Sequence, residues 1–206
     1  MRKTTLFFAL SLLLLVGCYS YRGTYDLSLV SVDRPEDQGQ RFGEMITGEA
    51  ENGGILYEDS VLKCVWVVGV DRLSFALKNK TENSMKIIWD EAAYIDQNGS
   101  TQKVMHSGVK YTDRNSSQPP SVIIRGAQIE DVVIPNDNVN YISGQYGGWR
   151  INPLFQNFAA NQAELNTVSS QYVGKEIRVL LPIEIKGVTN DYIFNFKVDG
   201  FNQTSP

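Results

Sequence analysis

The stretch at residues 177–198 reads IRVLLPIEIKGVTNDYIFNFKV, and it decides the fold class. Its two ends, 177–185 and 192–198, are rich in the β-branched and aromatic residues that favour strands. The polar residues between them include glycine and asparagine, which are typical of a turn. We therefore expect two neighbouring strands. Pro182 lacks an N–H group, so its place inside the first segment predicts an edge strand or a β-bulge.

Strand-like segments recur from this stretch back toward the N-terminus, with turn-forming residues between them. They span residues 25–32, 61–70, 73–77, 85–95, 122–124 and 129–134. The residues Gln97-Asn98-Gly99-Ser100 predict a hairpin turn. Residues 33–54 hold Pro35, several glycines and many acidic residues, so we expect a loop there. Short strands separated by turns predict an all-β fold, an antiparallel β-sandwich.

One short helix is predicted near residues 153–166. Asn152 can cap its first turn, and Pro153 suits the first helical position, where a missing N–H group costs nothing. The apolar residues that would share one face of this helix are Leu154, Phe155, Phe158, Ala159 and Leu165. We expect this face to cover an open end of the sandwich. The alternative is an apolar face that binds a partner.

The N-terminus has the features of a secretory signal. Arg2 and Lys3 supply positive charge, and residues 6–16 are apolar apart from Ser11. This run is too short to cross a hydrocarbon core, which needs roughly 20 residues. A charged start followed by a short apolar run is instead typical of a signal peptide.

The residues Leu15-Val16-Gly17-Cys18 resemble the lipobox of bacterial lipoproteins. The resemblance implies cleavage before Cys18, a diacylglycerol on its sulfur, and acylation of the new amino group by a fatty acid such as palmitate. Two or three acyl chains anchor a protein stably to a membrane, where one chain would be marginal. We therefore expect a signal peptide at 1–17, a lipidated tether at 18–24 and a single β-sandwich domain at 25–206.

The residues after Cys18 indicate which membrane would carry the lipid-anchored protein. Tyr19 follows it directly, and there is no aspartate of the kind that retains lipoproteins in the inner membrane of enteric-type bacteria. By this resemblance we expect the periplasmic face of the outer membrane. The outer face of a cytoplasmic membrane is the alternative.

Composition excludes several classes of function. Without Arg2 and Lys3, the 19 basic residues fall to 17 against 23 acidic ones, and no basic run is present. Such a domain is a poor candidate for binding nucleic acid. With Cys18 lipidated, Cys64 has no partner for an intramolecular disulfide. One histidine and one free cysteine cannot make a closed zinc site, and we expect neither metal nor cofactor.

The sequence offers few candidates for catalysis, and we assign no catalytic residue. A dyad of Cys64 and His106 would need a reactive thiol, but Cys64 lies in an apolar strand-like run. Asp90 and Glu91 lie beside aromatic residues, as in a glycosidase site. Neighbouring residues of a strand point to opposite faces, however, so these carboxylates would not converge.

Four aromatic residues are candidates for contact with a ligand or partner. Tyr146 and Trp149 lie in the glycine-rich run at 144–149, where they could stack on a sugar or grip a peptide. A flexible loop is the alternative interpretation of this run. Trp89 and Tyr94 flank the two carboxylates and form the second candidate pair.

Several segments between residues 55 and 200 resemble uncharacterised bacterial lipoproteins. They are Tyr57-Glu58-Asp59, residues 73–81, Ile87-Ile88-Trp89-Asp90, residues 104–109, residues 179–183 and residues 192–196. The Leu-x-Asn-x-Thr pattern at Leu77–Thr81 is also similar to small immunoglobulin-like envelope domains and to the LEA type 2 sandwich. These resemblances imply an immunoglobulin-like β-sandwich and transfer no catalytic residue.

The sequence therefore predicts a lipid-anchored, non-enzymatic module that binds an envelope protein as an adaptor. One alternative is a cell-wall or glycan hydrolase that uses Asp90 and Glu91, or His106. Another is a phage-type exclusion lipoprotein that blocks uptake of DNA.

Overall fold

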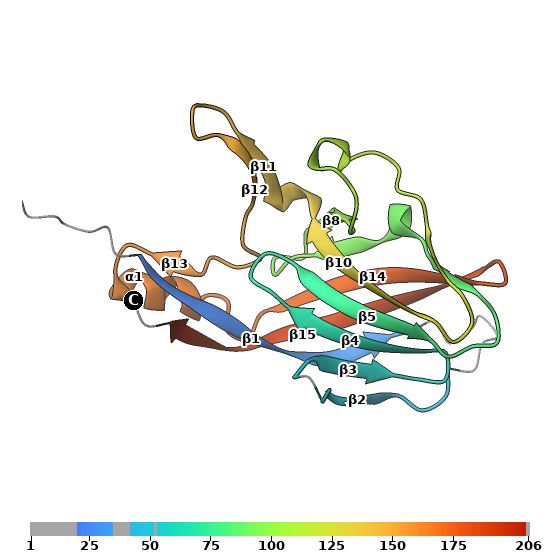
Figure 1. The fold of residues 1–206 in the computed structure, drawn as a ribbon. Coiled ribbons are helices and arrows are strands. Elements are labelled where there is room, and N and C mark those ends of the chain that lie inside the picture. Colours follow the sequence, from blue (N-terminus) through green and yellow to red (C-terminus); the bar gives the residue numbers. More distant parts are fainter. Residues whose placement is uncertain (1–19, 35–41, 52, 205–206) are drawn as a thin grey trace, which may run out of the picture.

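The computed structural model describes residues 20–34, 42–51 and 53–204 (Figure 1). The predicted signal peptide and Cys18 lie outside the described residues. The structure contains one α-helix, α1 (Gln162–Ser170), and three short 3-10 helices, η1 (Trp89–Glu91), η2 (Tyr111–Asp113) and η3 (Asn136–Asn138). Its strands are β1 (Tyr21–Asp33), β2 (Ile46–Glu49), β3 (Ile55–Glu58), β4 (Leu62–Val68), β5 (Leu73–Asn79), β6 (Met85–Ile87), β7 (Ala93–Ile95), β8 (Thr101–Met105), β9 (Ser121–Ile123), β10 (Gln128–Pro135), β11 (Val139–Ile142), β12 (Gly148–Ile151), β13 (Phe158–Ala159), β14 (Glu176–Ile185) and β15 (Val188–Thr204). The predicted all-β fold with one short helix is confirmed.

Most of the strands form one curled antiparallel sheet. Its order is β13-β1-β15-β14-β7-β8-β10-β5-β4-β3-β2, with β6 between β14 and β9. The sheet folds over so that β4 and β5 lie across from β14 and β15, which gives two layers (Figure 1). The strands β11 and β12 form a separate two-stranded hairpin. The architecture is therefore a sandwich made by one continuous sheet.

The core lies between the two layers and is held by aromatic contacts across them. The Trp66 ring of β4 lies 5.0 Å from the Phe194 ring and 5.5 Å from the Phe196 ring, both of β15. All three side chains are fully buried. Such a burial stabilises the fold by about 2–3 kcal/mol for each side chain.

The stretch at residues 177–198 forms the centre of the sheet, as its composition predicts. β14 and β15 make a hairpin in which Ile185 pairs with Val188. The turn between them consists of Lys186 and Gly187, which both have positive φ. This conformation is the one that matches the twist of a two-residue hairpin.

Pro182 does not lie on an edge strand. β14 pairs with β15 along one side and with β7 and β6 along the other. On this second side the pairs with β7 end at Leu180 and the pairs with β6 start at Ile183. The helix η1 occupies the break between them, and the Ile88 N–H donates to the Pro182 carbonyl over 3.0 Å. The ladder is therefore interrupted at the residue that has no N–H group to offer.

The predicted position of the helix is wrong. α1 begins after Asn161, whose side chain accepts a hydrogen bond of 2.9 Å from the Glu164 N–H, while the Glu164 carboxylate accepts one from Ala160 N–H. This arrangement is close to a capping box, and it outweighs the signal at Asn152 and Pro153. Phe158 and Ala159 are extended instead, because they pair with the start of β1.

The boundaries at the N-terminal end also differ from the prediction. β1 begins at Tyr21, four residues before the predicted strand, so residues 22–24 of the predicted tether at 18–24 pair with β15. The predicted loop at 33–54 contains β2, which pairs with β3. In both places the pairing of main-chain groups makes a strand from residues whose side chains are largely polar.

Candidate functional site

The hairpin of β11 and β12, which we call the arm (residues 139–151), projects away from the curled sheet (Figure 1). Residues 138–149 contain no charged side chain. Three large apolar or aromatic side chains of the arm are exposed, namely Tyr141, Ile142 and Tyr146, and Tyr146 has an exposed fraction of 87%. Exposed apolar groups that project together from a domain are typical of an interaction surface.

Trp149 joins the arm to the body of the protein. Its ring is half-buried and lies 5.4 Å from the Tyr141 ring and 5.8 Å from the Tyr111 ring. The Arg114 guanidinium carbon lies 5.2 Å from the centre of the indole. A cation over an aromatic face contributes about 0.5–1 kcal/mol at an exposed site. Trp149 therefore positions the arm, whereas Tyr146 is the accessible member of the predicted pair.

The loop at the tip of the arm has a fixed backbone that depends on glycine. The Gly147 N–H donates to the Gly144 carbonyl over 2.9 Å. A Cβ atom at Gly147 would lie 2.2 Å from the Ile142 carbonyl oxygen, so no other residue fits there. Arg150 adds a hydrogen bond of 3.3 Å to the Tyr146 carbonyl. These contacts hold the Tyr146 side chain outward.

Trp89 and Tyr94, the second predicted pair, are not contact residues in this structure. Their exposed fractions are 1% and 2%. The Trp89 indole Nε1–H donates to Ser121 Oγ over 2.8 Å, and the ring stacks on the His106 ring with a centroid distance of 4.3 Å. The prediction failed because η1 turns the tryptophan inward while the adjacent carboxylates point outward.

The two carboxylates beside Trp89 lie on an exposed turn of η1. Asp90 accepts hydrogen bonds from Ser117 Oγ and from the Gln118 N–H, the second over 2.8 Å. The bonds from Ser117 and then Gln118 lower the pKa of Asp90 below its usual value. These contacts give Asp90 a structural role, because they join η1 to the segment that precedes β9.

Cys64 and His106 have separate environments. Cys64 is fully buried on β4, and burial raises the pKa of its thiol well above the usual value. His106 Nδ1 lies 3.2 Å from the Asp131 carboxylate, which also accepts a bond of 2.7 Å from Ser107 N–H. A protonated, buried thiol is a weak nucleophile. The structure therefore does not assemble the dyad that the sequence left open.

A buried carboxylate at one end of the core was missed by the sequence analysis. The Asp59 side chain is fully buried and accepts five hydrogen bonds. Their donors are Arg34 at 3.1 Å, Tyr57 at 2.7 Å, Tyr192 at 3.2 Å and the main-chain N–H groups of Val61 at 2.8 Å and Leu62 at 2.9 Å. Because Arg34 and Tyr192 are distant in sequence from Asp59, no local pattern marks this cluster.

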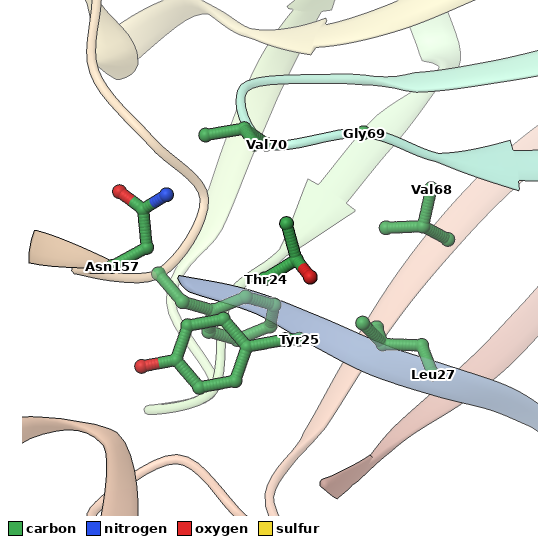
Figure 2. Close-up of a pocket in the computed structure, with 8 residues that line it drawn as sticks. Thr24, Tyr25, Leu27, Val68, Gly69, Val70 and Asn157 are labelled. Carbon is green, nitrogen blue, oxygen red and sulfur yellow. The ribbon is translucent and has the colours of Figure 1, made fainter. Parts of the chain in front are cut away.

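A small apolar pocket lies where β1 passes the turn between β4 and β5 (Figure 2). It is lined by Thr24, Tyr25 and Leu27 of β1, by Val68 at the end of β4, by Gly69 and Val70 of the turn, and by Phe155 and Asn157. Its volume of about 130 Å³ is below the range of ligand pockets, which begins at roughly 300 Å³. Asn157 is moreover bonded through its side chain to the Gly23 carbonyl. We interpret this pocket as a packing gap at the edge of the core rather than as a ligand-binding site.

Among the described residues, no group of three or more His, Cys, Asp and Glu side chains is placed to hold a metal ion. In the same part of the chain, no helix combines the length and apolarity that spanning a bilayer requires. No protein-family model matches this chain, and no curated protein or solved structure matches it either.

Proposed function

We propose that this chain is a lipid-anchored, non-enzymatic module of a bacterial cell envelope that binds an envelope protein through the arm. The observation that carries the proposal is a hairpin with a glycine-dependent tip, uncharged over residues 139–149, that projects exposed Tyr141, Ile142 and Tyr146 from a packed sandwich. The lipobox-like residues 15–18 support the anchor, and Tyr19, which stands where an inner-membrane retention signal has aspartate, supports a place on the periplasmic face of the outer membrane.

The chemistry of the arm suits a protein partner. Aromatic side chains supply a large contact area for little loss of conformational entropy, and they are enriched at the energetic centres of interfaces. The glycine-dependent tip and the packing of Trp149 fix the arm before a partner arrives. Such preorganisation lowers the entropic cost of binding.

The anchor leads to the first testable prediction. Replacing Cys18 with alanine removes the sulfur that would carry diacylglycerol, so we expect the protein to leave the membrane fraction and become extractable without detergent. Fractionation of cells, followed by mass spectrometry of the N-terminal peptide, measures both effects. A wild-type peptide that begins before residue 18 and carries no lipid would contradict the anchor.

The arm leads to the second prediction. Replacing Ile142 with serine removes an exposed apolar side chain without touching the core, and we expect at least a tenfold loss of partner crosslinking. A photoreactive residue at Tyr146 would capture the partner from native membranes. The melting temperature should stay within about 2 °C, because a surface change costs under ~0.5 kcal/mol.

The matched control is Ile124→Ser, which makes the same change at another exposed isoleucine away from the arm. It should leave crosslinking unchanged. Equal losses in the two variants, or capture of glycan fragments in place of a stoichiometric protein, would contradict the arm as a protein-binding site.

A further inference from the structure

The curled sheet does not close on itself. β1 lies near one end of the strand order and β2 at the other. On its outer side β1 pairs with β13 only at Tyr21 and Arg22. Among the described residues, no strand pairs with the outer side of β1 beyond Arg22 or with the outer side of β2. Within the part of the chain that the structure describes, two strand edges are therefore left open.

A groove of about 600 Å³ separates these edges, and we call it the seam. It is lined by residues 26–29 of β1, residues 47–49 of β2, and residues 53–55. Leu27, Leu29 and Ile55 pack against the core here but are only partly buried. The inward-facing aromatic residues of the adjacent β15 are, by contrast, fully buried. The core is therefore less well covered along the seam than it is beneath β15.

Exposed apolar side chains flank the seam on both sides. Val30 of β1 and Ile46 of β2 each have an exposed fraction of 53%, and Met45 is also exposed. An apolar residue on a free strand edge is a liability that proteins usually avoid with charge or proline. Its presence on both edges indicates a surface that another chain covers.

The main chain of β2 is placed to pair with a further strand. At the hairpin between β2 and β3, Ala50 N–H donates to the Gly54 carbonyl over 2.7 Å. Hydrogen-bonded and non-bonded pairs alternate along an antiparallel ladder, so Gly48 bonds to β3 while Thr47 and Glu49 turn their N–H and C=O groups to the open edge. A Cβ at Gly48 would meet nothing within 4 Å. A glycine in a strand often marks the close approach of a second backbone.

The charge of the seam indicates which side chains a partner would carry. Among the described residues, its ionisable lining residues are Asp26 and Glu49, and none of the lining residues is basic. Both side chains are exposed, and Asp26 accepts a hydrogen bond from the neutral amide of Asn202. The seam is therefore complementary to lysine or arginine side chains.

We propose that the seam is a docking site for an extended, basic segment of a partner protein, which adds as a strand between β1 and β2. Alternate apolar side chains of the segment cover Leu27, Leu29 and Ile55, and its main chain pairs with Thr47 and Glu49. Basic side chains on the outer face of the segment meet Asp26, and Glu49 adds to the negative charge of the seam. The seam shares no residue with the arm, so this site goes beyond the proposed function and stands without it.

The test uses the full-length protein in mild detergent and a synthetic peptide of about nine alternating valine and lysine residues, long enough to span ~30 Å. When the peptide binds, hydrogen exchange should slow at least tenfold at the outward-facing amides, namely those of Thr47 and Glu49 and those within residues 24–30 that do not bond to β15. A peptide with glutamate in place of lysine should bind at least tenfold more weakly. A peptide whose valine amides are methylated should not bind, because it cannot complete a ladder.

Matched variants distinguish strand addition from adhesion of a basic peptide. Thr47→Pro removes the outward N–H without touching the bonds to β3, and it should weaken binding at least tenfold. Thr47→Ala keeps the N–H and should bind within about twofold. In case proline disturbs folding, the double variant Asp26→Lys/Glu49→Lys keeps the backbone and should prefer the glutamate peptide.

Three results would overturn the proposal. The first is the absence of binding by the lysine peptide. The second is equal binding by Thr47→Pro and Thr47→Ala. The third is slow exchange at the Thr47 and Glu49 amides before any peptide is added, which would mean that this chain or a second copy already pairs with the edge. Loss of crosslinking through the arm would leave all three readouts unaffected.

Discussion

Replacing Asp59 with alanine is expected to lower the free energy of unfolding by about 3–5 kcal/mol, the cost of removing one partner from a buried ion pair. The change leaves the Arg34 guanidinium without its carboxylate. It also leaves the hydroxyls of Tyr57 and Tyr192 and two main-chain N–H groups without acceptors. Each buried group left unsatisfied adds roughly 1–3 kcal/mol before the structure relaxes.

Denaturant unfolding followed by tryptophan fluorescence measures this effect, because Trp66 is in the core. The control is the double variant Tyr57→Phe/Tyr192→Phe, which removes two donors but keeps Arg34 and the main-chain bonds. It should cost about 1–3 kcal/mol, less than Asp59→Ala. An Asp59→Ala protein as stable as the wild type would show that the cluster does not stabilise the fold.

A second large effect is expected at alkaline pH, where the protein should lose stability steeply above about pH 10. Burial, followed by the charge of Asp59, raises the pKa of Tyr57 and of Tyr192 far above the usual value of 10. The folded state therefore retains phenol protons that the unfolded state releases. The stabilisation is complete below pH 10 and is lost as the pH rises toward the folded-state pKa.

Each such tyrosine lowers stability by about 1.4 kcal/mol per pH unit in this range, so the pair accounts for about 3 kcal/mol per unit. Burial, followed by the nearby Tyr172, raises the pKa of Tyr25 to about 12. Tyr25 therefore adds to the fall of the unfolding free energy with pH. Measuring unfolding free energies from pH 8 to 11 tests this, and Tyr57→Phe/Tyr192→Phe should flatten the decline. The exposed Tyr146→Phe should not change it. A flat profile in the wild type would contradict the buried phenols.

The strands were predictable because their pattern is local. The stretch at 177–198 contains both the strand-forming residues and the turn, so it indicated β14 and β15 correctly. The turn Asn98-Gly99 likewise lies between β7 and β8, where the Asp96 N–H donates to the Ser100 carbonyl. In such segments the conformation of each residue is determined by its own side chain and by its immediate neighbours in the sequence.

The candidate sites were less predictable because distant segments decide their geometry. The buried position of Trp89 depends on a hydrogen bond to Ser121 and on stacking against His106, and neither residue is near Trp89 in the sequence. Asp59 meets Tyr192 across 133 positions of the chain. Tyr146 was accessible to sequence reasoning because a glycine-rich run keeps it away from other elements. The pairing of β2 was missed because its side chains carry no apolar alternation.

The pairing of β1 with β15 joins the first and last strands of the described chain, with Arg22 opposite Thr204. Whether the chain emerges from a ribosome or from a translocation channel, β1 emerges well before β15, its neighbour in the sheet. Contacts of such long sequence separation form slowly, since the loop between them must close first. The sheet of the described residues is therefore completed only after β15 has emerged, and until then β1 lacks the neighbour with which it makes most of its pairs.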